Sequence, residues 1–396
     1  MARTIGTVVR GVRAPIVKEG ENIVEIVVNS LLEAQAEEKF SFHDKDVVGI
    51  TESIVARTQG NYASIQDIAT DICSKFTGDS LVVLFPILSR NRFSLLLKGI
   101  AMSKKKIYLM LNYPSDEVGN SLMQVELMDD ADVNPHTDVL DEAAYRRIFG
   151  QEVKHPFTGI DYVSYYKSLA DDKNIEIILA NDPRVALNYS KDVLVANIHE
   201  RYRTKRILKN AGANIVYSLD QILDKPINGS GYNPECGLLG SNKATEDKIK
   251  LFPRECQPVV DAIQAELLAK TGKKIEVMVY GDGAFKDPVG QIWELADPVV
   301  SPAYTAGLAG QPNEIKIKYI ADTELVHLSK DELAKAMREK IMSKESDLTA
   351  KDASLGTTPR QLTDLLGSLC DLTSGSGDKG TPIILVQGYF DNYASE

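Results

Sequence analysis

Helix-like and strand-like patterns alternate at both ends of the chain, and a segment of different texture separates the two alternating regions. Near the N-terminus, residues 22–34 place apolar side chains on one helical face, and residues 46–51 and 81–86 have the apolar pattern of buried strands. A chain of 396 residues exceeds the length at which a single core usually stops growing, roughly 250–300 residues. The sequence therefore predicts two domains, or one domain with a large insertion.

The middle segment predicts a small α/β unit of its own. Strand patterns at residues 175–182 and 192–199 are followed by a basic helix pattern that ends at Gly212 and by a strand at 214–219. A strand, a crossover helix and a second strand form a βαβ unit. We predict an α+β fold in which a discontinuous core, residues 1–100 and 233–396, is interrupted by an inserted α/β domain at 101–232.

The last third resumes the alternation. A helix is expected from Pro258 to Gly272, then strands at 274–281 and 313–320. Ser329 and Glu332 have the spacing of a capping box, which predicts a helix after Ser329. Another helix should follow Pro359, and residues 381–388 should form the closing strand.

The charge balance and the cysteines limit the class of protein. Lys and Arg number 45 against 56 Asp and Glu, a net charge of −11, which argues against nucleic acid as the main partner. The sequence has no run of 18 apolar residues and does not begin like a signal peptide, so we expect no membrane span. Four widely spaced cysteines predict buried, reduced thiols in a cytoplasmic protein.

The segment SGSGDKGTP, residues 374–382, is the most distinctive local motif. Its three glycines tolerate the positive φ that a phosphate-cradling nest of backbone N–H groups requires. The match to G-x-G-x-x-G lies in the wrong context for a dinucleotide fingerprint, because the loop leaves a helix and enters a strand. Spacing alone leaves both a phosphate cradle and a flexible surface loop open.

Two other segments carry candidate chemistry directly after strands. Asp282 and Asp287 lie on turns that could present carboxylates to Mg²⁺ or Mn²⁺, although a solvated turn explains them equally well. Glu52, Ser53 and Arg57 follow the strand at 46–51, where they could bind a charged ligand or simply cap a turn. The basic side chains of residues 201–209 surround their helix, which favours a solvated surface.

Four blocks of the sequence together resemble the coenzyme F-420:L-glutamate ligase (gamma-glutamyl ligase) family. The blocks are GVRAPIVKEGENI, DVVGITESIVARTQGN, GLLGSNKATEDKIKLFPRE followed by TGKKIEVMV, and GSGDKGTPIILVQG. The resemblance covers roughly residues 1–90 and 233–396. It implies a ligase that uses GTP, or ATP, with Mg²⁺ or Mn²⁺. An acceptor carboxylate would become an acyl phosphate, which the amine of L-glutamate attacks; the acceptor could resemble coenzyme F-420 or a folate. A cytoplasmic homodimer is also implied.

The resemblance also implies site residues. The nucleotide-binding positions correspond to Arg13, Ala14, Pro15, Ile16, Glu52, Ser53, Arg57, Asn242, Gly375, Ser376, Gly377, Asp378, Gly380 and Thr381. The metal-binding aspartate corresponds to Asp287, with Asp282 as the alternative.

Two acidic metal positions of the family are replaced in this chain, by Leu239 and by Ser376. One of two metals could be lost, or be held by carboxylates such as Asp378 or Asp116. A non-catalytic nucleotide-binding or regulatory relative is therefore the alternative function, and the basic helix of the insertion is a weaker third candidate.

Overall fold

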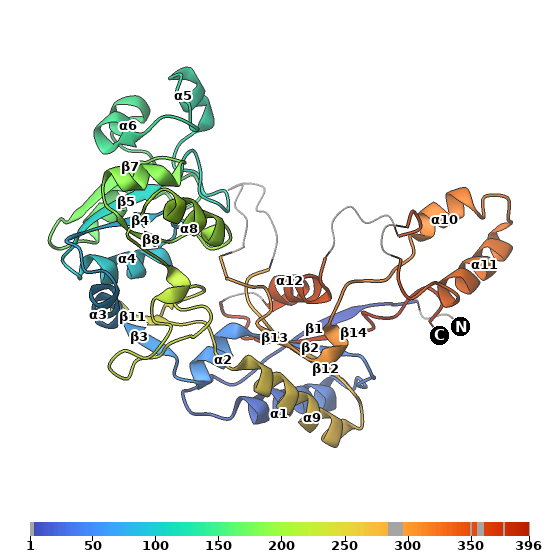
Figure 1. Cartoon of the computed structure of the whole chain (residues 1–396). Coiled ribbons are helices and arrows are strands. Elements are labelled where there is room, and N and C mark those ends of the chain that lie inside the picture. Colours follow the sequence, from blue (N-terminus) through green and yellow to red (C-terminus); the bar gives the residue numbers. More distant parts are fainter. Residues whose placement is uncertain (1–3, 284–295, 349–350, 355–359, 375–376, 396) are drawn as a thin grey trace.

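The structure is a computed structural model that describes residues 4–283, 296–348, 351–354, 360–374 and 377–395. Within these residues the strands form sheets of five, three and six strands (Figure 1). Helices cover the five-stranded and six-stranded sheets, and the chain belongs to the α+β class, as predicted.

The five-stranded sheet carries the ends of the chain. Its strands, in spatial order, are β1 (Val8–Val12), β14 (Ile383–Gln387), β2 (Val47–Thr51), β12 (Glu276–Tyr280) and β13 (Ala303–Tyr304). Only β2 and β12 run parallel; the other neighbours are antiparallel. The helices that accompany this sheet are α1 (Ile23–Glu38), α2 (Glu52–Thr58), α9 (Cys256–Thr271) and α12 (Leu362–Ser374), with the short η3 (Ala306–Leu308).

Both faces of the five-stranded sheet are covered. On one face, Val27 of α1 and Ile263 of α9 pack with Val277 of β12 in one apolar cluster. On the other face, Met278 packs with residues of α12. Every residue of β12 is therefore buried, whereas the sequence predicted only one inward face.

Glycine is required where α12 meets the sheet. A Cβ at Gly49, in the middle of β2, would lie 2.5 Å from the Sγ of Cys370 on α12. Such a distance is shorter than any normal contact, so the absence of a side chain lets the helix pack directly on the strand.

The six-stranded sheet has the order β6 (Leu140–Asp141), β7 (Ile175–Leu179), β5 (Lys106–Leu111), β4 (Ser80–Leu84), β8 (Asp192–Val195) and β9 (Ile215–Ser218). All neighbours are parallel except β6 and β7. The parallel strands thus take the spatial order 3-2-1-4-5 of a doubly wound sheet.

This sheet includes the predicted βαβ unit, β8–α8–β9, and it begins earlier than the insertion was expected to begin. Strand β4, which lies within residues 1–100, pairs with β5 and β8 of this sheet. The domain limits themselves stay a prediction. The accompanying helices are α3 (Ile65–Lys75), α4 (Phe93–Ala101), α5 (Val125–Asp130), α6 (Glu142–Phe149), α7 (Tyr162–Ser168), η1 (Pro183–Asn188), α8 (Arg201–Asn210) and η2 (Leu219–Gln221).

The N-terminus of α8 is capped by a carboxylate from another loop. Glu117, in the loop after β5, accepts the backbone N–H groups of Ile198, His199 and Glu200 at 2.5, 3.1 and 3.3 Å. These three donors lie between β8 and Arg201, the first residue of α8. The carboxylate therefore lies just before the helix N-terminus, the end of a helix that favours negative charge.

The basic side chains of α8 are solvated only in part: Arg203 is exposed, whereas the side chain of Arg201 is 14% exposed. Lys205 donates to the Ser218 hydroxyl at 3.1 Å, Arg201 lies 3.4 Å from Asp220, and Arg203 pairs with Glu200. The first two contacts join α8 to the end of β9 and to the residues after it.

A small three-stranded sheet contains β10 (Asn242–Lys243), β11 (Lys248–Lys250) and β3 (Tyr62–Ser64). Figure 1 shows β3 and β11 between the two larger sheets. Because α2 precedes β3 and α3 follows it, this small sheet connects the two larger parts of the molecule.

The strand predicted at 313–320 is wrong. The chain forms α10 (Ile317–Thr323), which pairs with α11 (Lys330–Met342) in the projecting orange hairpin of Figure 1. Ile320, Met337 and Ile341 form its apolar cluster, so tertiary packing decides the conformation against the local alternation. The capping box predicted at Ser329 is confirmed.

All four cysteines are thiols, but only Cys256 and Cys370 are buried, whereas Cys73 is exposed. The prediction of buried thiols thus holds for two of the four residues and is wrong for Cys73. Among the described residues, no helix combines the length and the apolar character that crossing a membrane requires.

Candidate active site

A cavity of about 1340 Å³ opens where several segments converge at one end of the five-stranded sheet. The parallel strands β2 and β12 end at the same edge, so Glu52 after β2 and Asp282 after β12 both line it. Residues after β1, the small sheet and the end of α12 complete the walls. This cavity is the main cleft of the protein.

The glycine loop is fixed beside the main cleft by contacts to three elements. The carbonyl oxygen of Gly380 accepts the N–H of Ala14 at 3.2 Å, and that of Pro382 accepts the N–H of Thr51 at 3.0 Å. The Thr381 hydroxyl donates to the carbonyl oxygen of Ser374 at 2.6 Å. Gly377 and Gly380 have φ of 124° and 65°, values that glycine adopts without strain.

Glu52 is a buried carboxylate in the wall of the main cleft, with an exposed fraction of 6%. Its oxygens lie 3.2 and 3.4 Å from the Nζ of Lys250, which also donates to the Ser53 hydroxyl at 2.6 Å. Burial raises the pKa of Glu52 to about 7, although the charge of Lys250 opposes the shift. Glu52 can therefore exchange a proton near neutral pH.

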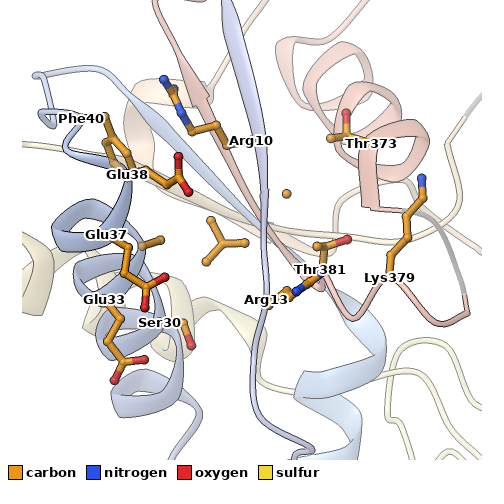
Figure 2. Close-up of a pocket in the computed structure, with 13 residues that line it drawn as sticks. Arg10, Arg13, Ser30, Glu33, Glu37, Glu38, Phe40, Thr373, Lys379 and Thr381 are labelled. Atoms are coloured by element: carbon orange, nitrogen blue, oxygen red, sulfur yellow. The ribbon is translucent and has the colours of Figure 1, made fainter.

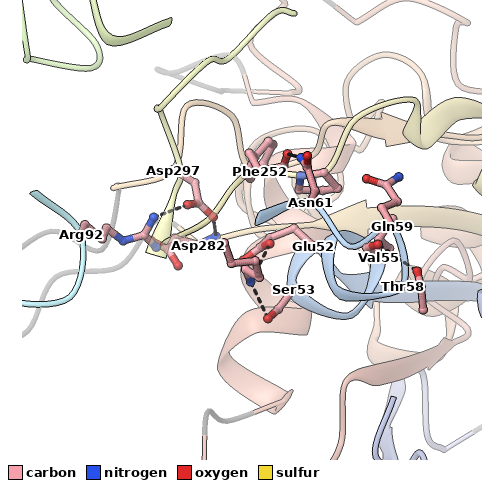
Figure 3. A network of polar contacts seen from close by, with 12 residues as sticks. Glu52, Ser53, Val55, Thr58, Gln59, Asn61, Arg92, Phe252, Asp282 and Asp297 are labelled. Carbon is pink, nitrogen blue, oxygen red and sulfur yellow. Dashed lines mark hydrogen bonds and ion pairs between the residues drawn. The ribbon is translucent and has the colours of Figure 1, made fainter. Parts of the chain in front are cut away.

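A network of ion pairs lies beside Glu52 (Figure 3). Arg92, in the loop before α4, donates to Asp282 and to Asp297, each at 2.6 Å. Asp297 also accepts the backbone N–H of Asp282 at 2.8 Å, and Asp371 accepts that of Gly283 at 2.9 Å. Burial raises the pKa of Asp371, and the neighbouring Asp297 raises it further.

The described residues do not form a ready metal site. Within them, no three His, Cys, Asp or Glu side chains are grouped so that they could hold a metal ion. Asp282 and Asp297 are already bridged by the guanidinium of Arg92. Asp116, proposed as a substitute ligand, is buried elsewhere and accepts backbone N–H groups of Leu88, Val118 and Asn120. Its role is to shape that loop.

A second cavity, of about 750 Å³, adjoins the main cleft and shares Thr381 with it. Figure 2 shows that basic side chains and acidic side chains both line this cavity. Arg10, Arg13 and Lys379 provide cations, and α1 contributes three carboxylates, Glu33, Glu37 and Glu38. The two cavities lie on either side of the segment that leaves β1 and the loop that enters β14.

A family model described as F420-0:Gamma-glutamyl ligase matches residues 11–388. The chain belongs to the F420-0:gamma-glutamyl ligase family. No curated protein matches the chain significantly. The match extends across the glycine loop and every other wall of the main cleft, so the geometry above belongs to a member of a ligase family.

Most positions that the resemblance implied for nucleotide binding in this gamma-glutamyl ligase family member line the main cleft. They are Ala14, Pro15, Ile16, Glu52, Ser53, Arg57, Asn242, Gly377, Gly380 and Thr381. Arg13 lines the second cavity instead, and Asp378 is exposed outside both cavities. Gly375, Ser376 and Asp287 lie outside the described residues. Asp282, the alternative metal ligand, lines the main cleft but is paired with Arg92.

Four residues of the site were not predicted from the sequence: Lys250, Arg92, Asp297 and Asp371. Lys250 ends a short Lys-Ile-Lys strand, and this alternation gave a weak signal that one lysine faces inward. No local pattern marks Arg92, which reaches its partner Asp297 across 205 positions of the sequence. Leu239, in place of a family aspartate, is buried and packs in the apolar cluster of the six-stranded sheet.

Proposed function

We propose that this chain is a nucleotide-dependent ligase that joins the amine of L-glutamate to a carboxylate-bearing acceptor through an acyl phosphate. The observation that carries the proposal is the convergence of the glycine loop, the ends of β2 and β12 and the small sheet on one cleft. A volume of about 1340 Å³ is ample for a nucleotide together with part of a second substrate.

The cleft offers complementary surfaces for a nucleotide. Ile16, 83% exposed, lies with Ala14 and Pro15 on one wall and gives an apolar surface for a base. Arg57, Lys243 and Lys250 supply positive charge for phosphates. The glycine loop, with positive φ at Gly377, can turn backbone N–H groups toward an anion. We propose GTP or ATP, entering with Mg²⁺ or Mn²⁺ on its phosphates, where the cation would offset the negative charge.

The buried carboxylate of Glu52 suits the amide-forming step. The nitrogen of L-glutamate must lose a proton as it attacks the acyl carbon and phosphate leaves. Because the pKa of Glu52 is raised to about 7, its carboxylate can accept that proton near neutral pH. Lys250 holds the carboxylate in place and would lie beside the departing phosphate.

The second cavity is a suitable place for L-glutamate. Its three cationic side chains can pair with two carboxylates, and the acidic face of α1 can pair with an ammonium group. Because it shares Thr381 with the main cleft, an amino acid held there lies next to the nucleotide. K379Q should then raise the half-saturating concentration of L-glutamate several-fold without changing nucleotide affinity. Lys18→Gln, an exposed lysine outside both cavities, is the matched control.

The direct test is product formation. The protein is incubated with labelled L-glutamate, GTP or ATP, Mn²⁺, and either a coenzyme F-420-like or a folate-like acceptor, and the acceptor is analysed by mass spectrometry. Addition of one glutamyl residue with release of phosphate is the expected result. Nucleotide binding without product on either acceptor would favour the alternative, a nucleotide-binding or regulatory relative, which Leu239 motivates. The expected homodimer is tested by light scattering of the purified chain.

A further inference from the structure

The guanidinium of Arg92 has the position of a bridging cation. One terminal nitrogen is 2.6 Å from Asp282 and the other is 2.6 Å from Asp297, so that one positive group holds two carboxylates from different segments (Figure 3). Asp297 is almost fully buried, and the side chain of Arg92 is 18% exposed. Short, charge-assisted contacts of this kind are among the strongest hydrogen bonds in proteins.

One side of Arg92 faces a small apolar cavity. Leu239 and Arg92 line the same small cavity, of about 30 Å³, together with Phe93 and Leu96. This apolar side stabilises the stem of an arginine but offers no oxygen to a hard cation. In the described part of the chain, no group of three potential metal ligands forms here, and the single guanidinium of Arg92 compensates one of the two negative charges of Asp282 and Asp297.

We propose that Arg92 is a built-in cation that replaces an exchangeable divalent cation between Asp282 and Asp297. With Arg92, the three groups sum to a charge of −1, whereas without it the two carboxylates would carry −2, the value that attracts a divalent ion. The inference deepens the proposed function: divalent cation in the reaction would come with the nucleotide and would not be bound to this carboxylate pair. Arg92 acts through Asp282, which lines the main cleft, and is a positioning residue.

If Arg92 replaces a divalent cation, its removal should change the number of Mn²⁺ ions bound per chain, whether or not the protein is active. Mn²⁺ bound per full-length chain is counted by electron paramagnetic resonance, without nucleotide. R92Q removes the charge and should bind one more Mn²⁺ than the wild type, and the double variant R92Q/D282N should lose that gain. Arg90→Gln makes the same charge change in the same loop at an exposed side chain, and its Mn²⁺ count should equal that of the wild type.

A second variant leaves Arg92 intact, in case R92Q does not fold. D282N should leave the Mn²⁺ count of the wild type unchanged, because the proposal gives Asp282 no exchangeable ion. A lower count in D282N, or an unchanged count in folded R92Q, would overturn the inference. Failure of the proposed ligase would be seen differently, as no nucleotide binding or product, and would leave the Mn²⁺ count untouched.

Discussion

The raised pKa of Glu52 makes the stability of the protein depend on pH in a way that one substitution should remove. The pKa of Glu52 is about 7 in the folded protein, against an ordinary value of 4.5. The folded state therefore keeps a proton that the unfolded chain has released. The resulting stabilisation is fully present below about pH 4.5 and is lost as the pH rises through 7.

The difference between 4.5 and about 7 corresponds to about 3 kcal/mol, because one pH unit is worth about 1.4 kcal/mol. Most of this lies between pH 5 and pH 8. Over that interval the free energy of unfolding of the wild type should fall by about 2–3 kcal/mol more than that of E52Q, whose side chain has a similar shape but cannot ionise.

The assay is urea denaturation of both proteins at a series of pH values, with ¹³C NMR of labelled glutamate carboxyls to follow the titration directly. Glu126→Gln, an exposed residue in the first turn of α5, is the control and should show the same pH dependence as the wild type. Parallel curves for the wild type and E52Q would refute the reasoning, because they would mean that Glu52 titrates alike in both states.

Three further outcomes are expected. In a thermal-shift titration, GTP or ATP with Mn²⁺ at 100 times the dissociation constant should stabilise the protein by about 2.7 kcal/mol, and neither nucleotide doing so would contradict the proposed function. G49A should cost about 1–3 kcal/mol in urea denaturation, because its Cβ would lie 2.5 Å from the Sγ of Cys370; Gly6→Ala, with open space around it, should change nothing. D71A should cost about 3–5 kcal/mol, since this buried carboxylate pairs with Lys75 at 2.8 Å; a loss below 1 kcal/mol would show that the pair is dispensable.

The sequence predicted those parts of the fold that local chemistry determines. The capping box at Ser329 and the apolar runs of β2 and β14 marked a helix start and two buried strands correctly. In contrast, residues 313–320 alternate in a way that fits a strand, yet they contribute to a helical hairpin because Ile320 packs against α11. A short alternating segment cannot decide between the two without its neighbours.

The sequence predicted only those site residues that stand next to the end of a predicted strand. Glu52, Asp282 and the glycine loop follow or precede strands, so their place at one sheet edge followed from the pattern. Lys250 and Arg92 meet their partners from 190 to 205 positions away in sequence, and only the folded chain shows that the charges compensate one another. Position along the chain therefore indicated Glu52 and Asp282, and the tertiary structure was needed to find Asp297, Asp371 and the counter-charges.

The carboxylate of Glu117, just before α8, affects which anions can reach one end of the six-stranded sheet. The six-stranded sheet has the strand order of dinucleotide-binding folds, in which phosphate binds at the helix N-terminus beside the point where the order reverses. Helix α8 follows β8, which lies on one side of that point, and the N–H groups that precede α8 already bind a carboxylate attached to the same chain. A tethered group competes at a high effective concentration, which a dissolved anion must overcome. Glu117 thus keeps dissolved anions away from the backbone between β8 and α8.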